Sequence, residues 1–423
     1  MLVAFIFALA LIIGVPIAFM LGLAGFAHIL VMDPDMLAAL PQMLFATANN
    51  YGLMAIPLFI LAGELMELSG DVQRLTDFSR AVVGKIKGGL AYVLVILGFL
   101  LGGPLGSANA EAALLSSTLY PEMKKDGYDE RFASGLIAAI SVVGPLIPPG
   151  MLMVIYGVAS GTSIAALFMA GVMPGVYLTI VLWAVVYLVG RKRDWPVTNW
   201  GGWGNVWYTF KRAFFSIAAP LLVLAAIVLG IVTPTESAAV ASVLTFLIGT
   251  FIYRKIHLRE LIPILLRTGV LSGAILIIGA MGGAFGWTLA MAQVPQKVAA
   301  FILSLTENPI IVMLMLNVFL FVVGMFMDAV PAVMILVPVF MPIVKQMGYD
   351  LVHFGLVMCF NLTIGLLTPP VGTVLYTTAM ATGVKTDVIV KSIWVWVLVC
   401  AAVLLFVTYL PSSIMFIPNM IMK

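Results

Sequence analysis

The chain has 423 residues, of which 63% are hydrophobic and only 9% are charged, with a formal net charge of +3. A soluble globular protein carries roughly 25% charged residues, so this composition excludes soluble enzymes and nucleic-acid-binding proteins. Because one membrane-spanning helix needs about 20 apolar residues, the chain has material for many crossings. We therefore predict an all-α polytopic membrane protein.

Apolar stretches separated by charged loops predict helices along the whole chain. The first run, 2–31, is too long for a signal-peptide core and is predicted to be a retained span. The further predicted elements, in chain order, are a weak segment 36–48, a span 51–67, an amphipathic piece 68–87, a hairpin 88–120, a broken helix 132–160, a span 163–189, a polar linker 190–212, spans 213–232, 235–253 and 268–290, a hairpin 309–344, a broken helix 352–380 and a final span 392–417.

Four of these apolar elements are interrupted by glycine and proline. The first hairpin is interrupted at 102–107 and the second near Asp328 and Pro331. The broken helices carry a Pro-Pro pair within 144–150 and 368–370. Proline removes a backbone donor and blocks the helix, and glycine lets the chain turn. Each interruption therefore frees backbone polar groups at membrane depth.

The two interrupted regions repeat each other at an offset of 221 residues. Nine identities occur at this one offset, and they include a Pro-Pro pair and a Gly-Tyr-Asp triplet in each half. Recurrent prolines alone do not explain the Gly-Tyr-Asp match. The identical positions are Gly103, Pro121, Lys124, Gly127, Tyr128, Asp129, Gly144, Pro148 and Pro149 in the first half.

The basic residues predict the orientation of the repeats. If 88–120 enters and leaves the membrane on one side, 18 of the 21 lysines and arginines fall in loops on the cytoplasmic side. The first hairpin then opens to the cytoplasm and the second to the outside. We predict a first inverted repeat over 1–189, a cytoplasmic linker over 190–212, and an extra span plus the second inverted repeat over 213–423. Inverted repeats with broken helices indicate a secondary transporter.

Hairpin tips and Pro-Pro loops are the predicted sites of chemistry. At the carboxyl end of a half-helix, free carbonyl oxygens can bind a small hard cation such as Na⁺. At the amino end of a half-helix, free N–H groups can bind a carboxylate. The predicted Na⁺ ligands are Gly106, Ser107, Gly144, Pro145, Gly324, Asp328, Gly365 and Thr368. The predicted substrate-binding residues are Ser107, Asn109, Glu111 and Thr373.

Acidic residues in apolar segments are further candidates, because a charge inside a membrane is costly. Asp328, at the second tip, is the strongest of them. Glu111 is read equally well as a helix cap and as a group near the cation or substrate. Glu64 is predicted to be interfacial or paired with a neighbouring subunit. Glu236 follows a Thr-Pro-Thr sequence that favours a helix cap.

Enzymatic chemistry is not predicted. The sequence contains no convergent nucleophile and base, no transition-metal cluster and no phosphate-binding loop for ATP. Coupling to an ion gradient is therefore the expected source of energy. A stand-alone Na⁺/anion symporter of the same architecture, or a channel, remains an alternative at this point, although two hairpins from opposite faces favour alternating access.

Several motifs resemble the large membrane subunit of tripartite ATP-independent periplasmic (TRAP) transporters. The resemblance covers essentially the whole chain. The motifs that carry it are 55–63 (AIPLFILAG), 147–149 (IPP), 167–171 (LFMAG), 233–236 (TPTE) and 365–372 (GLLTPPVG). The first tip departs from the Ser-Gly-Ser pattern of many relatives, because it reads GPLGSANAE over 103–111.

The resemblance implies properties that spacing does not show. It implies an elevator-type ion transporter fold, a small four-helix membrane subunit as partner, and a periplasmic binding protein that delivers the substrate. It further implies Na⁺-driven uptake of an organic acid across the bacterial inner membrane. Cation sites are implied at the hairpin tips and the two Pro-Pro loops, which here correspond to Ser107 with its neighbours, Asp328, and the loops 144–149 and 365–370.

Overall fold

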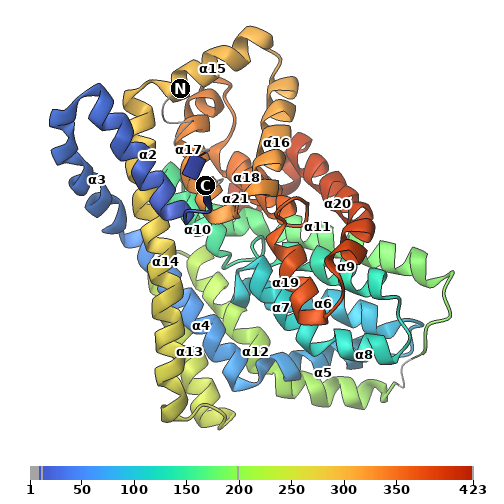
Figure 1. The fold of residues 1–423 in the computed structure, drawn as a ribbon. Coiled ribbons are helices and arrows are strands. Elements are labelled where there is room, and N and C mark those ends of the chain that lie inside the picture. Colours follow the sequence, from blue (N-terminus) through green and yellow to red (C-terminus); the bar gives the residue numbers. More distant parts are fainter. Residues whose placement is uncertain (1–8, 11–12, 198–199, 422–423) are drawn as a thin grey trace.

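The computed structural model describes residues 9–10, 13–197 and 200–421. Within these residues the regular elements are helices, with one isolated β-bridge between Lys87 and Val197 (Figure 1). Eight of the described helices are long and apolar enough to cross a membrane. The prediction of an all-α polytopic membrane protein is thus confirmed.

The helices follow one another through short turns, and their order in the described chain is as follows. The first half contains α2 (Ile17–Met32), η1 (Pro34–Ala38), α3 (Ala39–Ala48), η2 (Tyr51–Met54), α4 (Ala55–Ser69), α5 (Asp71–Val83), α6 (Gly89–Leu105), α7 (Ala108–Thr118), α8 (Tyr120–Lys125), α9 (Glu130–Ile140), η3 (Ser141–Val143), α10 (Met151–Ser160) and α11 (Ile164–Gly190). The second half contains α12 (Gly202–Val228), α13 (Pro234–Leu247), η4 (Ile248–Ile252), α14 (Leu258–Met291), α15 (Val294–Leu305), α16 (Pro309–Phe326), α17 (Ala329–Gln346), α18 (Leu351–Gly365), α19 (Thr373–Thr382), α20 (Thr386–Tyr409) and α21 (Ser412–Ile421).

Some predicted boundaries are wrong. The predicted span 2–31 falls partly outside the described residues, and in the described part it is interrupted, since Gly14 has φ +80° and Pro16 is the N-cap of α2. The helix α14 begins inside the predicted basic loop, because polar residues lengthen it beyond its apolar core. Hydropathy also missed α15, and the predicted final span 392–417 joined α20 to the first half of α21.

The order of helices repeats at the same offset as the sequence identities. When 221 is added to the bounds of α6, of α9 taken together with η3, of α10 and of α11, they fall within two residues of the bounds of α16, α18, α19 and α20. The pair α7 and α8 corresponds in the same way to the single helix α17. Each half therefore contains a helical hairpin followed by a broken helix.

The repeated Gly-Tyr-Asp triplet forms the turn between hairpin and broken helix. Gly127 and Gly348 adopt φ of +76° and +70°, the left-handed conformation that glycine accepts without a Cβ clash. Asp129 then caps α9, because its carboxylate accepts from the backbone N–H of Arg131 at 2.8 Å. Asp350 caps α18 through the N–H of Val352 at the same distance. The triplet is thus a folding signal rather than a ligand.

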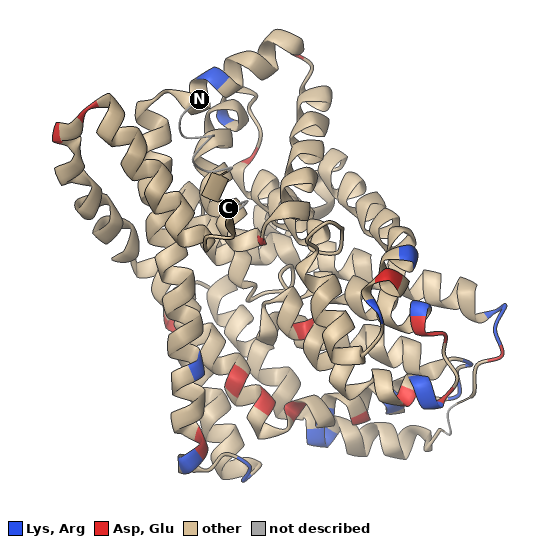
Figure 2. Ribbon diagram, viewed as in Figure 1, with Lys and Arg blue, Asp and Glu red and all other residues tan. Residues whose placement is uncertain are grey.

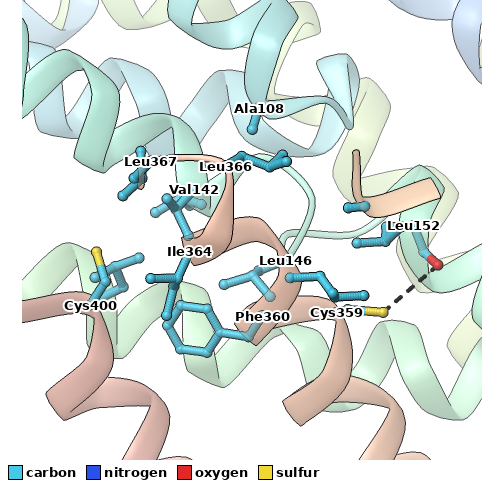
Figure 3. Close-up of a cluster of buried hydrophobic side chains, with 14 of the residues drawn as sticks. Ala108, Val142, Leu146, Leu152, Cys359, Phe360, Ile364, Leu366, Leu367 and Cys400 are labelled. Atoms are coloured by element: carbon cyan, nitrogen blue, oxygen red, sulfur yellow. Dashed lines mark hydrogen bonds between the residues drawn. The ribbon is translucent and has the colours of Figure 1, made fainter. Parts of the chain in front are cut away.

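The two repeats pack reciprocally. Helix α10 of the first broken helix lies against α17 of the second hairpin, and α19 of the second broken helix lies against α7 of the first hairpin. The hydroxyl of Tyr156 donates to the carbonyl of Leu351 at 2.8 Å, and the thiol of Cys359 donates to the carbonyl of Leu152 at 3.8 Å. Figure 3 shows this apolar contact between the halves. Hairpins and broken helices are therefore joined in one core.

Charged side chains gather toward one side of the molecule. Figure 2 shows most of them in the region of α5, α8 and the amino end of α14, and few near α15. Ion pairs join neighbouring segments there: Arg80 with Glu122, and Lys124 with Glu130 at 3.0 Å. The predicted 190–212 linker docks on this side, because Trp195 is buried and stacks on Tyr128 with ring centroids 4.7 Å apart. That tryptophan is therefore packed in protein.

Replacing Gly365 with Ala tests the close contact between the second hairpin and its broken helix. A Cβ at Gly365 would lie 2.5 Å from the backbone of Gly324, which has no flexible side chain to move. We expect a loss of about 1–3 kcal/mol, as for overpacked cores, measured as a lower melting temperature of the purified protein. Gly269→Ala is the control, because a Cβ there meets nothing within 4 Å. Equal melting temperatures for both variants would contradict the contact.

Candidate functional site

The tips of the two hairpins are built alike. Ser107 is the N-cap of α7, where its hydroxyl accepts from the N–H of Ala110 at 3.5 Å. Asp328 is the N-cap of α17 and accepts from the N–H of Val330 at 3.3 Å. The two caps are 221 residues apart, so they occupy equivalent positions in the repeats. At each tip a helix begins inside the protein with a polar side chain and free backbone N–H groups.

Each tip touches the Pro-Pro loop of its own repeat. A Cβ at Gly106 would lie 3.3 Å from the backbone nitrogen of Met151 and 3.4 Å from the carbonyl oxygen of Pro149. In the second repeat, the N–H of Val371 donates to the carbonyl of Met325 at 3.1 Å. Both Pro-Pro bonds, 148–149 and 369–370, are cis. The backbone of each loop therefore finds partners in protein.

A cavity of about 540 Å³ lies between the two tips. One side is formed by the first tip with the adjoining Pro145 and Met151, and by Asp328 through Pro331 of the second tip. Thr363 and Leu366 of the second broken helix complete that side. Tips from both halves and both broken helices thus contribute to a single cavity.

Most of the rest of the cavity lining comes from two further helices, α4 and α14. From α4 come Ile60, Gly63, Glu64 and Glu67, which lie on one helical face. From α14 come Leu271, Ile275 and Ile278, which likewise follow helical spacing. Gly63 allows the approach of the first hairpin, because a Cβ there would lie 2.9 Å from the carbonyl oxygen of Pro104.

The predicted site residues divide into two groups. Gly106, Ser107, Asn109, Pro145 and Asp328 line the cavity. The others lie behind its wall in the described structure and are not among its lining residues: Glu111, Gly144, Gly324, Gly365, Thr368 and Thr373.

The residues behind the wall are packed in the two helix breaks. Gly324 lies against Gly365, where a Cβ would meet its Cα at 3.1 Å. The buried hydroxyl of Thr368 donates to the carbonyl of Ile364 at 3.2 Å. Thr373 begins α19, and its buried Oγ1 has no hydrogen-bond partner among the described residues. These positions can support ligands at the tips without facing the cavity themselves.

Glu111 lies beside the first break in the helical backbone. It is fully buried in the first turn of α7, and neither carboxylate oxygen has a hydrogen-bond partner among the described residues. A Cβ at Gly98 would lie 2.8 Å from its Oε1, and a Cβ at Gly144 would collide with its Oε2. Since Ser107 provides the cap of α7, Glu111 is placed against the Gly144 loop instead.

The donor set at the tips fits Na⁺. Hydroxyl, carboxylate and backbone carbonyl groups are hard oxygen donors, which are the kind that an alkali cation prefers. The side-chain oxygens of Glu111 and Thr373 lie close to the interruptions of the helices and have no hydrogen-bond partner in the described structure. No cluster of three His, Cys, Asp or Glu side chains occurs in the described part of the chain, so a transition-metal site is not formed there.

Sequence reasoning missed part of the cavity. Glu64 was expected at an interface, whereas it lines the cavity and its Oε2 lies 3.7 Å from Arg267 of this same chain. Glu67 and Thr363 were not predicted at all. The spacing of residues 60, 63, 64 and 67 in the sequence indicates that they share one face of a helix. It does not indicate what that face lies against. The predicted cap at Glu236 is confirmed, since it forms a capping box with Thr233.

Residues 4–413 match the family model described as "Tripartite ATP-independent periplasmic transporter, DctM component". The chain belongs to this family. It is 36% identical over 399 residues to the C4-dicarboxylate TRAP transporter large permease protein DctM of Pseudomonas aeruginosa, covering 94% of this chain and 93% of that protein. It is 33% identical to the sialic acid TRAP transporter large permease protein SiaM of Vibrio cholerae, over 96% of this chain and 95% of that protein.

A third relative within the DctM family is the 2,3-diketo-L-gulonate TRAP transporter large permease protein YiaN of Escherichia coli, 33% identical over 95% of each chain. Among solved structures, the fold is similar to that of the Alcanivorax borkumensis YdaH transporter, with a TM-score of 0.66 at 13% identity over 90% of each chain. The resemblance to TRAP large subunits is therefore confirmed. This DctM-family chain is a transporter permease and not an enzyme.

The accessibility of the cavity can be tested with cysteine labelling. The two native cysteines, Cys359 and Cys400, are both buried, so we expect the folded wild type to resist a membrane-permeant maleimide. Asn109→Cys should be labelled, because Asn109 lines the cavity. Ala112→Cys is the matched control on the same helix, and it should stay unlabelled because Ala112 is fully buried. Labelling measured by mass spectrometry that is equal at both positions would contradict the cavity.

Proposed function

We propose that the chain is the transmembrane permease of a Na⁺-coupled secondary transporter that imports an organic acid across the bacterial inner membrane. The observation that carries this proposal is the convergence of both hairpin tips and both broken helices on one cavity. Secondary transporters with broken helices bind substrate and coupling ion at such a junction, where half-helix termini supply charge without ionised side chains.

The substrate's carboxylate would bind at the amino ends of α7 and α17. Free N–H groups and the helix dipole favour an anion at such ends. Ser107 and Asn109 add hydroxyl and amide donors beside the first tip. The named substrates of the three relatives, a C4-dicarboxylate, sialic acid and 2,3-diketo-L-gulonate, all carry a carboxylate.

Na⁺ would bind where each tip meets its Pro-Pro loop. We propose Gly106, Ser107, Gly144 and Pro145 for the first repeat. Gly324, Asp328, Gly365 and Thr368 are proposed for the second. When bound there, the cation would offset the charge of the incoming carboxylate and of Asp328, so that substrate and ion enter together. Glu111, buried beside Gly144, is proposed as a charged neighbour of the first site.

We further propose an elevator movement of the two inverted repeats. The reciprocal packing of hairpins and broken helices would let them move as one body. The helices α4 and α14, which also line the cavity, would then belong to the fixed part. Motion of the two repeats relative to α4 and α14 would carry the cavity across the bilayer.

The proposed complex contains a small four-helix membrane subunit and a periplasmic binding protein. The name of the family, a tripartite periplasmic transporter, supports both partners. The side of the molecule with most basic residues, which includes α5, would face the cytoplasm under the positive-inside rule. The binding protein would then dock on the opposite side.

Uptake into proteoliposomes tests the coupling and the partner together. We expect uptake of a radiolabelled organic acid only with an inward Na⁺ gradient and with the cognate binding protein outside. The physical reason is that the proposed cavity needs Na⁺ to offset the charge of the acid. Uptake that persists without Na⁺ would refute the coupling, and uptake without the binding protein would favour a stand-alone symporter.

Variants at the tips test the placement of the cation. Ser107→Ala removes a proposed oxygen ligand and Asp328→Asn removes the negative charge of another, so we expect about a tenfold or greater rise in the Na⁺ concentration for half-maximal uptake, as for the loss of 1.4 kcal/mol of binding. Ser304→Ala, on the exposed part of α15, is the control and should leave this concentration unchanged. Unaltered Na⁺ dependence in both tip variants would refute the site.

A further inference from the structure

The part of the cavity lining that comes from α4 is acidic, because it contains Glu64 and Glu67. Together with Ile60 and Gly63, these glutamates are spaced i, i+3, i+4 and i+7, so the four residues form one continuous face of α4. Gly63 contacts the end of the first hairpin, which places the two glutamates beside and beyond the first tip. The carboxylates of Glu64 and Glu67 therefore present hydrogen-bond acceptors to whatever occupies the cavity.

By contrast, the wall formed by the hairpin tips presents mainly hydrogen-bond donors. The amino ends of α7 and α17 lie there, and Asn109 adds an amide. These groups donate hydrogen bonds and favour a negative charge. The acid of this wall, Asp328, has a backbone hydrogen bond of its own at the second tip.

The cavity has no basic residue among its described lining. Its charged lining residues are Glu64, Glu67 and Asp328. Arg267 lies one turn before Leu271 on α14 and pairs with Glu64 at 3.7 Å, but it is not among the residues that line the cavity. No ion pair in the described chain reaches Glu67. The α4 wall therefore keeps an uncompensated carboxylate.

We propose that the substrate is a hydroxylated monocarboxylate. Its one carboxylate faces the hairpin tips, and hydroxyl groups at its other end donate to Glu64 and Glu67. A dicarboxylate of similar length would place its second charge against the α4 wall, where like charges repel and no lining cation compensates. This inference rests on the proposed function, because it assumes that the cavity is the organic-acid site.

The test compares two acids of matched chain length. Succinate has a carboxylate at each end, whereas L-threonate has one carboxylate and hydroxyl groups along the rest of the chain. Each is titrated in Na⁺ buffer into the purified protein, with its membrane partner where one co-purifies, and binding is followed as the rise in melting temperature. We expect L-threonate to stabilise the wild type and succinate to bind at least about tenfold more weakly.

A double variant changes the acidic wall without changing its shape. Glu64→Gln with Glu67→Gln removes both charges and releases Arg267 from its pair, so succinate binding should strengthen about tenfold or more relative to L-threonate. Glu307→Gln is the matched control, since it removes an exposed carboxylate in the turn before α16 that does not line the cavity. It should leave the preference unchanged.

Three results would overturn the inference. One is equal or tighter binding of succinate by the wild type, and another is an unchanged preference in the double variant. The third is that Na⁺ stabilises the protein but neither acid does, in which case the hydroxylated-monocarboxylate inference fails while Na⁺ binding stands. Failure of the proposed function is seen separately, as organic-acid uptake that is independent of Na⁺.

Discussion

The structure depends on one constraint, which is that backbone polar groups inside a membrane must find partners within the protein. In hydrocarbon no water is available for a free N–H or C=O group. This chain nevertheless breaks its helices at two hairpin tips and two Pro-Pro loops. The breaks are tolerated because each tip contacts its own loop and because the caps Ser107 and Asp328 accept backbone N–H groups.

Burial of the breaks also explains how the repeats are joined. The second part of each broken helix packs on the second arm of the other repeat's hairpin, α10 on α17 and α19 on α7. Each repeat thus supplies part of the other's surroundings. The free helix ends then face inward to one cavity, where partial charges of the backbone can act on a ligand in a low-dielectric setting.

Much of this arrangement could be predicted from the sequence. The 221-residue offset, the hairpin tips at Ser107 and Asp328 and the positions of the broken helices follow from glycine, proline and capping patterns, which act locally. The α4 wall could not be placed in the same way. The helical spacing of 60, 63, 64 and 67 shows that these residues share one face of α4. That this face lines the same cavity as the tips depends on the packing of α4 against the first hairpin at Gly63, which no local pattern indicates. The helix α15 was missed because its 12 residues are too few to span a membrane.

The central claim is that the two tips share one site for Na⁺ and an organic acid. A structure of the complex determined with Na⁺ and its transported acid tests this most directly. The account predicts density for the acid in the cavity, in contact with Ser107 or Asn109, and cation density where each tip meets its Pro-Pro loop. Density for the acid outside this cavity, or tips without a bound cation in the substrate-loaded state, would contradict it.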